Sequence, residues 1–577
     1  MERAFDIVVR GGTVVDGTGS AAFEADVAIK DGRIVAVGAI QGAGALEIDA
    51  KGQLVTPGFV DIHTHYDGQA TWDTHMQPTS WHGVTTAVMG NCGVGFAPCK
   101  PADRERLMRL MEGVEDIPFP VLTEGLPWNW ETYAEYLDSL SGRRFDMDLG
   151  SLLPHAPVRV WVMGERGANR EAATEDDIRA MAVIARQAIE AGALGFSTSK
   201  TLNHRTKAGE HTPTLAASED ELTGIAMGLK AAGGGIMEYI GDYMDPVEEF
   251  AMLRRLVEAT GRPVSFGLAQ ITERPGNYRV MLDKLGEALA AGLPMSAQAA
   301  PRAIGILFGL ELTLNPFLQY PAWAEIQDMP LNEKVARLRD PGFRARLLAE
   351  HGGEKVRVID LQDWSKMFLM GEEPDYEQHP DHTVAAIAAR TGRAPAEVAL
   401  EHMLTQEGRG VLYLAFANYM SGNLDVVREM LSHRAVAPGL GDGGAHVGTI
   451  CDGSFPTTML THWTRDRTRG PKLPLEEMVR KQTSFTAGIV GLNDRGVIAP
   501  GYRADLNVID YDRLRLLSPQ VAYDLPKGGR RLVQRAEGYT ATIVAGEVTY
   551  RDGQPTGALP GRLVRGAKSG PVALAAE

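Results

Sequence analysis

The sequence is poor in the features that mark secreted or membrane-bound proteins. Only three cysteines, Cys92, Cys99 and Cys451, occur among 577 residues, which is too few for a disulfide framework in so long a chain. No run approaches the roughly 20 apolar residues of a membrane-spanning helix. The first residues lead into a strand pattern without the apolar segment of a secretion signal. These absences predict a cytoplasmic protein without a membrane partner.

The chain also has no surplus of basic residues. It contains 58 Lys and Arg against 74 Asp and Glu, a net charge of -16, and no stretch concentrates the basic side chains. Binding of nucleic acid needs a positive surface, so nucleic acid is not expected as a partner. With 44% hydrophobic and 23% charged residues, the composition is that of a folded protein. A small-molecule substrate is the expected partner, and a homo-oligomer is an open alternative to a monomer.

Short strand patterns occupy both ends of the chain. Residues 1–56 contain several apolar strand patterns separated by turns, and Asp31-Gly32 is a strong hairpin signal. The same style returns at 504–509 and 539–544. Neither end alone has enough strands for a stable sandwich. The sequence therefore predicts a small β-sandwich domain built from 1–56 and 491–577.

The middle of the chain, 57–490, alternates short apolar strands with helical stretches such as 174–191, 219–232 and 246–259. The expected strands are 58–62, 85–89, 149–153, 195–199, 235–239, 264–268, 411–415 and 435–439. Eight strands in such an alternation predict an α/β fold, a distorted (β/α)₈ TIM-like barrel. The region 300–400 is too long for one strand–helix unit, and we expect an insertion over the barrel mouth.

The sharpest chemical signal is a pair of histidines at the end of the first expected barrel strand. In Pro57-Gly-Phe-Val-Asp-Ile-His63-Thr-His65, the imidazoles stand at positions i and i+2, which share one face of an extended strand. At the carboxyl end of a barrel strand, that face lines the active-site mouth. Two converging imidazoles form half of a zinc site, although a lone His-x-His is often structural.

Several further blocks recur in order along the chain: Gly83-Val-Thr-Thr-Ala-Val-Met-Gly-Asn-Cys92-Gly, Leu194-Gly-Phe-Ser-Thr-Ser199, Gly441-Asp442-Gly-Gly-Ala-His446 and Gly496-Val-Ile-Ala-Pro-Gly501. With the histidine pair, they resemble the N-acyl-D-amino-acid deacylase (D-aminoacylase) family of the amidohydrolase superfamily. The resemblance implies a distorted (β/α)₈ barrel with a flanking β domain and metal-dependent amide hydrolysis.

The resemblance also implies a ligand set. His63, His65, Cys92 and Asp442 match one metal position, and Asp442 would also act as general base and acid. For Cys92, a small buried residue beside a tight turn is the alternative, since four protein ligands and a water crowd a tetrahedral ion. The family has histidines after its fifth and sixth strands, whereas this chain has Glu238 and no histidine there. We therefore expect one zinc ion, and a two-metal site stays open.

Other residues are expected to contact the substrate. His155 follows the third strand and is expected to stabilise an oxyanion or bind substrate, with a buried histidine satisfied by protein partners as the alternative. Lys200 is expected to meet a substrate carboxylate, with a carbamylated bridging lysine or a surface lysine as alternatives. Glu238 is an extra ligand or a group that orients water. The remaining candidates for substrate binding are Arg302, Asn418 and His446.

The expected reaction is hydrolysis of the amide bond of an N-acyl amino acid or a related N-acyl compound. The same machinery can open a cyclic amide or a lactone, or cleave a xenobiotic amide or carbamate, and these stay open as alternatives. A non-catalytic scaffold is a further alternative, although such relatives lose metal ligands while His63, His65 and Asp442 are present in this chain.

Overall fold

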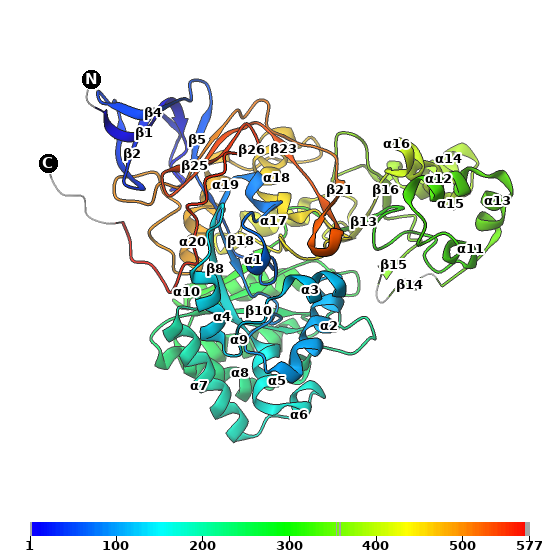
Figure 1. Ribbon diagram of the computed structural model, residues 1–577, viewed down its shortest axis with the longest axis horizontal. Coiled ribbons are helices and arrows are strands. Elements are labelled where there is room, and N and C mark those ends of the chain that lie inside the picture. Colours follow the sequence, from blue (N-terminus) through cyan, green and yellow to red (C-terminus); the bar gives the residue numbers. More distant parts are fainter. Residues whose placement is uncertain (1–2, 354, 357–358, 572–577) are drawn as a thin grey trace.

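The computed structural model describes residues 3–353, 355–356 and 359–571. Its centre is a curled sheet of eight parallel strands in the order β18-β12-β11-β10-β9-β8-β7-β6 (Figure 1). The strands are β6 (Phe59–Asp61), β7 (Val84–Met89), β8 (Asp148–Pro154), β9 (Gly195–Lys200), β10 (Ile236–Gly241), β11 (Val264–Gly267), β12 (Met295–Ala299) and β18 (Val436–Pro438).

The two outer strands of this sheet meet through the residues that follow them. The backbone N–H of Asp442 donates to the carbonyl of His63 at 3.1 Å, and the N–H of His65 donates to Gly443 at 2.7 Å. These bonds join the end of β6 to the loop after β18. The sheet therefore curls far enough to bring its first and last strands together at their carboxyl ends.

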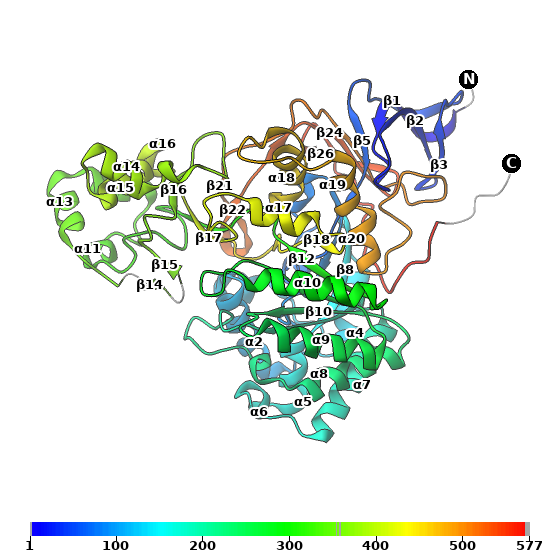
Figure 2. The same ribbon diagram turned by 180° about the vertical axis from the view of Figure 1, so that it is seen from behind.

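Helices follow most of the strands and cover the outside of the sheet (Figures 1 and 2). They include α4 (Tyr133–Ser141), α7 (Glu175–Ala191), α8 (Glu219–Ala231), α9 (Pro246–Thr260), α10 (Asn277–Ala290), α17 (Asp425–Ser432), α19 (Leu475–Lys481) and α20 (Ser484–Ile489). Helix α7 begins at a capping box in which Thr174 and Asp177 satisfy each other's backbone N–H groups. The helices expected near 174–191, 219–232 and 246–259 are confirmed.

The prediction that residues 411–415 form a barrel strand is wrong. Residues 411–415 do form a strand, β17 (Leu412–Ala417), but it pairs antiparallel with β13 (Ile304–Phe308) and β16 (Met367–Leu369) in a separate sheet. The seventh barrel position belongs to β12, between β11 and β18. Its sequence, Met-Ser-Ala-Gln-Ala, is poor in the β-branched and aromatic residues that signal a strand.

Residues from both ends of the chain share a nine-stranded sheet, with the path β26-β25-β24-β19-β5-β1-β2-β3 and β4 paired to β1. Strands β5 and β19 join the two halves, with Val55 opposite Val508. The strands are β1 (Arg3–Val14), β2 (Phe23–Lys30), β3 (Arg33–Gly38), β4 (Ala43–Asp49), β5 (Leu54–Pro57), β19 (Leu506–Ile509), β24 (Tyr539–Val544), β25 (Glu547–Arg551) and β26 (Gln554–Pro555).

The segment between β12 and β18 forms a lobe that projects to one side of the central sheet (Figures 1 and 2). The lobe has its own core, which includes Phe317, Trp323 and Leu400. Its base reaches the loop after β18, where Leu307 donates to Thr449 at 2.8 Å. Its helices are α11 (Pro321–Ala324), α12 (Leu331–Arg339), α13 (Pro341–Ala349), α14 (Val384–Thr391), α15 (Pro395–Met403) and α16 (Thr405–Gly408).

Three two-stranded ladders complete the described strands, and in the lobe β14 (Lys355–Val356) pairs with β15 (Ile359–Asp360). In the C-terminal part, β20 (Arg515–Leu516) pairs with β23 (Ala536–Glu537), and β21 (Gln520–Leu525) pairs with β22 (Gly529–Val533). Within the described ranges, no helix is long and apolar enough to cross a membrane.

Candidate metal centre

His63 and His65 follow β6 and are both buried, with exposures of 0% and 1%. Their ring centroids are 5.6 Å apart and their planes stand at 72°. Thr64 lies between them in sequence, and its hydroxyl donates to the carbonyl of Val88 on the neighbouring strand at 2.9 Å. The alternation of an extended chain therefore places both imidazoles on one side.

Asp442 approaches the two histidines from the loop after β18. Its Oδ1 atom lies 3.2 Å from Nε2 of His63 and 3.4 Å from Nε2 of His65. The next residue must be small, because a Cβ atom on Gly443 would stand 2.3 Å from Oγ1 of Thr79. The glycines of the Gly441-Asp442-Gly-Gly block thus let this loop lie close against β6 and carry the carboxylate to the imidazoles.

Cys92 enters from the loop after β7, in a left-handed conformation with φ of 56°. Its Sγ atom lies 3.4 Å from Nε2 of His63, and donor atoms of His63, His65 and Cys92 all lie within 4.8 Å of one another. A Cβ atom on Gly90 would stand 2.2 Å from the carbonyl oxygen of Leu152. Glycine at that position therefore lets the loop press against the adjacent strand and bring the thiol inward.

The donor atoms fit a divalent metal ion. Ligands about 2.0–2.3 Å from a tetrahedral ion stand roughly 3.3–3.6 Å apart, close to the contacts of 3.2, 3.4 and 3.4 Å around Nε2 of His63, Nε2 of His65, Oδ1 of Asp442 and Sγ of Cys92. Both ring nitrogens of His65 and Oδ1 of Asp442 are buried without a hydrogen-bond partner among the residues that the structure describes. Such orphaned polar atoms are costly unless they coordinate something.

The electrostatics of the cluster also suit a cation. Burial alone would raise the pKa of Asp442, but the two adjacent histidines hold it well below its ordinary range. Burial would lower the pKa of His63, but Asp442 and Glu238 raise it to about 9. For Cys92, burial and then the surrounding carboxylates raise the pKa well above its usual value. A thiolate at this position therefore requires a bound cation beside it.

Two residues on other strands of the central sheet contact the Nδ1 side of His63. Gln298 on β12 accepts a hydrogen bond from Nδ1 of His63 at 3.0 Å, which leaves Nε2 facing Asp442. Glu238 on β10 places Oε1 3.8 Å from the same Nδ1 atom, and its Oε2 accepts from the backbone N–H of Cys92 at 3.2 Å. Burial raises the pKa of Glu238 to about 7. Glu238 thus lies beside His63, and its expected role as an extra ligand or a group that orients water stays a prediction.

The structure gives His155 and Lys200 partners that differ from those expected. Both ring nitrogens of His155 are engaged at 2.8 Å, one by Thr198 and the other by Glu221, so neither is free to bind an oxyanion. Nζ of Lys200 donates to the carbonyl of Ala217 at 2.6 Å. The ammonium group of Lys200 is thus engaged by the backbone, and its expected contact with a substrate carboxylate stays a prediction.

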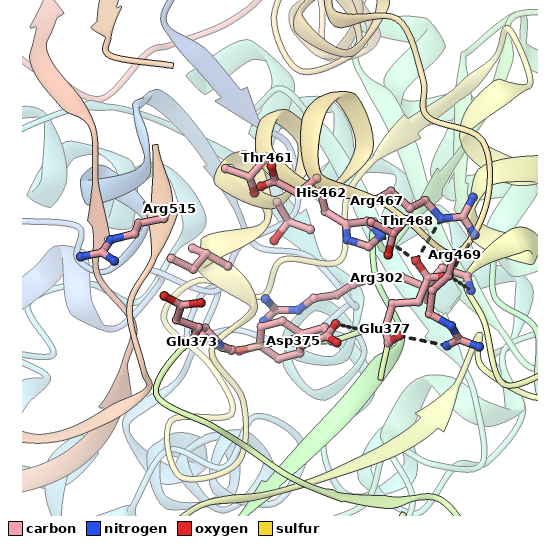
Figure 3. A pocket seen from close by; sticks show the side chains of 16 residues that line it. Arg302, Glu373, Asp375, Glu377, Thr461, His462, Arg467, Thr468, Arg469 and Arg515 are labelled. Carbon is pink, nitrogen blue, oxygen red and sulfur yellow. Dashed lines mark hydrogen bonds and ion pairs between the residues drawn. The ribbon is translucent and has the colours of Figure 1, made fainter. Parts of the chain in front are cut away.

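Arg302 is likewise committed to internal partners. It donates to Asp452 at 2.6 Å and to Ser454 at 3.1 Å, and it stacks 3.7 Å from the ring centroid of Tyr376. Figure 3 shows Arg302 at the wall of a cavity of about 420 Å³, together with His462 and several other arginines. None of the four expected metal ligands lines this cavity. Two of the donors of Arg302 are therefore engaged by internal partners, and its expected role in holding the substrate stays a prediction.

Asn418 and His446 lie closer to the expected roles. Asn418 follows β17, and its side-chain oxygen accepts from the N–H of Gln270 at 2.7 Å, while its amide nitrogen is buried without a partner. His446 is 30% exposed, and its Nε2 lies 4.0 Å from Oδ2 of Asp442. Each therefore keeps a polar group available near a strand end of the barrel or near the metal cluster.

Three further residues of this centre were not predicted from the sequence. Gln298 lies on the barrel strand that was not expected. Glu115 follows α2 (Arg104–Val114), and its carboxylate lies 3.6 Å from Nδ1 of His65. His204 follows β9 and bonds Ser199 at 2.8 Å; burial, with His446 and His65 nearby, lowers its pKa to about 3. Glu115 and His204 come from loops without a recognisable motif, so only the fold brings them here.

The curled parallel sheet and the His–His–Cys–Asp cluster are those of a metal-dependent hydrolase. Residues 46–550 match the model of the amidohydrolase family, and the chain belongs to that family. It is a hydrolase that acts on carbon–nitrogen bonds other than peptide bonds. The membership of the amidohydrolases expected from the sequence blocks is confirmed.

Within this family, the chain is similar over its full length to deacylases of N-acyl-D-amino acids. A D-aminoacylase from Alcaligenes xylosoxydans xylosoxydans is 27% identical over 571 residues, covering 97% of this chain and 98% of the relative. An N-acyl-D-glutamate deacylase from the same organism is 28% identical, with 98% and 97% covered. A crystal structure of D-aminoacylase matches with a TM-score of 0.65 and 25% identity, covering 97% of this chain and 100% of that chain.

Proposed function

We propose that the protein hydrolyses the amide bond of an N-acyl amino acid with one zinc ion held by His63, His65, Cys92 and Asp442. The observation that carries the proposal is the approach of Asp442 Oδ1 to Nε2 of both histidines, at 3.2 and 3.4 Å. The substrate class follows from the full-length likeness to a D-aminoacylase and an N-acyl-D-glutamate deacylase. That likeness favours an N-acyl-D-amino acid.

A zinc ion in such a site lowers the pKa of water toward roughly 7 and polarises the amide carbonyl. Asp442 accepts the proton of the attacking water and then delivers it to the departing nitrogen, a role that suits a carboxylate held beside two imidazoles. Gln298 keeps Nδ1 of His63 occupied, so that His63 presents Nε2 to the centre. Glu238 contributes a further oxygen that orients the water.

The substrate is held, in this proposal, by Asn418 and His446. The buried amide nitrogen of Asn418 has no partner in the described part of the chain and is a ready donor to a carboxylate or carbonyl. His446 stands beside Asp442 with part of its ring exposed. His155 and Lys200 are engaged by Glu221 and by the carbonyl of Ala217, and they take no part in the chemical step.

We further propose that the nine-stranded sheet of 1–56 and 491–577 forms a β-sandwich beside the barrel domain of 57–490. Apolar residues of both ends, among them Ile7, Val27, Val508 and Ile543, pack in one core, which supports a single domain. A reducing compartment suits Cys92 as a thiolate ligand, and we place the protein in the cytoplasm on that ground.

The test is a hydrolysis screen of N-acetyl amino acids of both configurations, run with and without a chelator. We expect cleavage of at least one N-acyl-D-amino acid, its loss on chelation and its return with added zinc. Cyclic amides, lactones and aryl carbamates belong in the same panel, because the metal chemistry does not distinguish among them. Cleavage confined to those compounds would replace the N-acyl amino acid as the substrate. A metal-free protein inert toward the whole panel would be a scaffold.

A further inference from the structure

Glu115 lies beside the metal centre although it belongs to none of the barrel strands. It follows α2, in the segment between β7 and β8, and its side chain is 1% exposed. Neither of its carboxylate oxygens has a hydrogen-bond partner within the described residues. Burying a carboxylate without partners is costly, so its placement calls for a role in the centre that it adjoins.

The carboxylate lies close to one ring nitrogen of each of two imidazoles. Its Oε1 lies 3.6 Å from Nδ1 of His65, and its Oε2 lies 3.5 Å from Nε2 of His446. Nε2 of His65 faces Asp442, so Nδ1 carries the proton whenever Nε2 binds a metal. The backbone supports the arrangement, because the N–H of His446 donates to the carbonyl of Glu115.

We propose that Glu115 is a positioning residue that orients His65 toward the metal and holds His446 beside Asp442. In this proposal, the 3.6 Å contact between Oε1 of Glu115 and Nδ1 of His65 shortens to a hydrogen bond when Nε2 binds a metal. Accepting that Nδ1–H selects the tautomer whose Nε2 points at the centre and increases the basicity of Nε2. This inference rests on the proposed function for the presence of the metal. It gives His65 a carboxyl oxygen as its partner, as the amide oxygen of Gln298 is the partner of His63.

The role of Glu115 differs from that of a ligand in a way that can be measured. A residue outside the coordination sphere changes the affinity of the metal but leaves its ligands in place. Cobalt(II) bound by His63, His65, Cys92 and Asp442 should therefore have the same visible spectrum in the native protein and in Glu115→Gln. A changed number of ligands would alter that spectrum, and would overturn the positioning role in favour of direct coordination.

The main experiment compares zinc affinity in Glu115→Ala, Glu115→Gln and a matched control, Glu105→Ala. Glu105 lies on α2 with its side chain 64% exposed. Competition with a chromophoric chelator gives the dissociation constant, and the melting temperature of the metal-free protein reports folding. We expect a 10–100-fold loss of affinity for Glu115→Ala, partial rescue in Glu115→Gln, whose amide oxygen still accepts a hydrogen bond, and no change in the control.

A lower metal-free melting temperature with zinc affinity within twofold of the native value would mean a structural role and overturn the proposal. Unchanged affinity and unchanged melting in Glu115→Ala would overturn it as well. A different result would overturn the proposed function: a native protein that binds zinc but cleaves no amide. A native protein that binds no zinc would overturn both.

Discussion

Gln298 accepts a hydrogen bond from Nδ1 of His63 at 3.0 Å, and its amide nitrogen donates to the hydroxyl of Ser265 at 3.1 Å. Ser265 on β11 thus orients the side-chain amide of Gln298, and this amide in turn orients the imidazole of His63, which follows β6. Because Nδ1 is the proton-bearing nitrogen in this contact, Nε2 is left free for a metal. Gln298, on a strand that carries no recognisable motif, therefore fixes the tautomer of His63 in the histidine pair.

Replacing Gln298 by leucine keeps the volume and removes the acceptor. We expect zinc affinity to fall about 10-fold or more, the magnitude typical for loss of a hydrogen bond to a ligating histidine. Titration against a competing chelator measures the change. Gln554→Leu on the exposed strand β26 is the control, and equal affinities in the two variants would contradict the role of Gln298.

The carboxylate of Asp442 is expected to carry proton transfer as well as ligation. Asp442→Asn preserves the shape but removes the base, so kcat for amide cleavage should fall about 10²–10⁴-fold. Steady-state kinetics with zinc in excess measure this effect. Asp381→Asn, at a position 79% exposed, should leave kcat unchanged. A rise in KM with kcat unchanged would mean that Asp442 only binds the substrate.

Metal binding should also stabilise the fold. A ligand that binds only the native state adds RT ln(1 + [L]/Kd), or about 4 kcal/mol at a free zinc concentration 1,000 times Kd. We expect thermal melting in a scanning calorimeter to shift upward with zinc and downward with chelator. His63→Ala should abolish this response, and His379→Ala, at a position 54% exposed, should keep it. Zinc-independent melting of the native protein would argue against the site.

The parts of the site that could be predicted are those carried by local patterns. His63 and His65 end an apolar strand, and Cys92 and Asp442 lie in glycine-rich blocks, so both position and chemistry are visible in the sequence. The helix at Glu175–Ala191 begins one residue after the expected start because Thr174 is its cap. Such features depend on neighbours within a few residues.

The parts that could not be predicted depend on pairing across the chain. Met295–Ala299 is a barrel strand because Ala297 lies opposite Phe266 and Val436, whereas the more apolar Leu412–Ala417 pairs within the lobe. Glu115 occurs in Glu-Gly-Val-Glu-Asp, a composition typical of an exposed helix end. Its burial against His65 follows only from the path of the loop after β7, and no spacing rule reveals that path.

Stability toward acid should depend on Glu377, which lies in the wall of the cavity in Figure 3. Its carboxylate accepts two hydrogen bonds from Arg467, at 3.0 and 2.9 Å, and lies 3.0 Å from His462. Burial acts to raise its pKa, but His462, Arg467 and the N–H of Leu424 lower it from 4.5 to about 2. A carboxyl group whose pKa is lower in the folded state stabilises the protein above its unfolded pKa.

We expect Glu377→Gln to lose about 3 kcal/mol of unfolding free energy at pH 7, as the pKa difference implies. The deficit should shrink as pH falls from about 4.5 toward about 2, because over that range the carboxyl group binds a proton in the unfolded state while the folded carboxylate stays ionised. Urea denaturation at a series of pH values measures both variants, with Glu373→Gln at the exposed rim of the cavity as the control. A deficit that stayed constant from pH 7 to pH 3 would show that the contribution of Glu377 is packing and not charge.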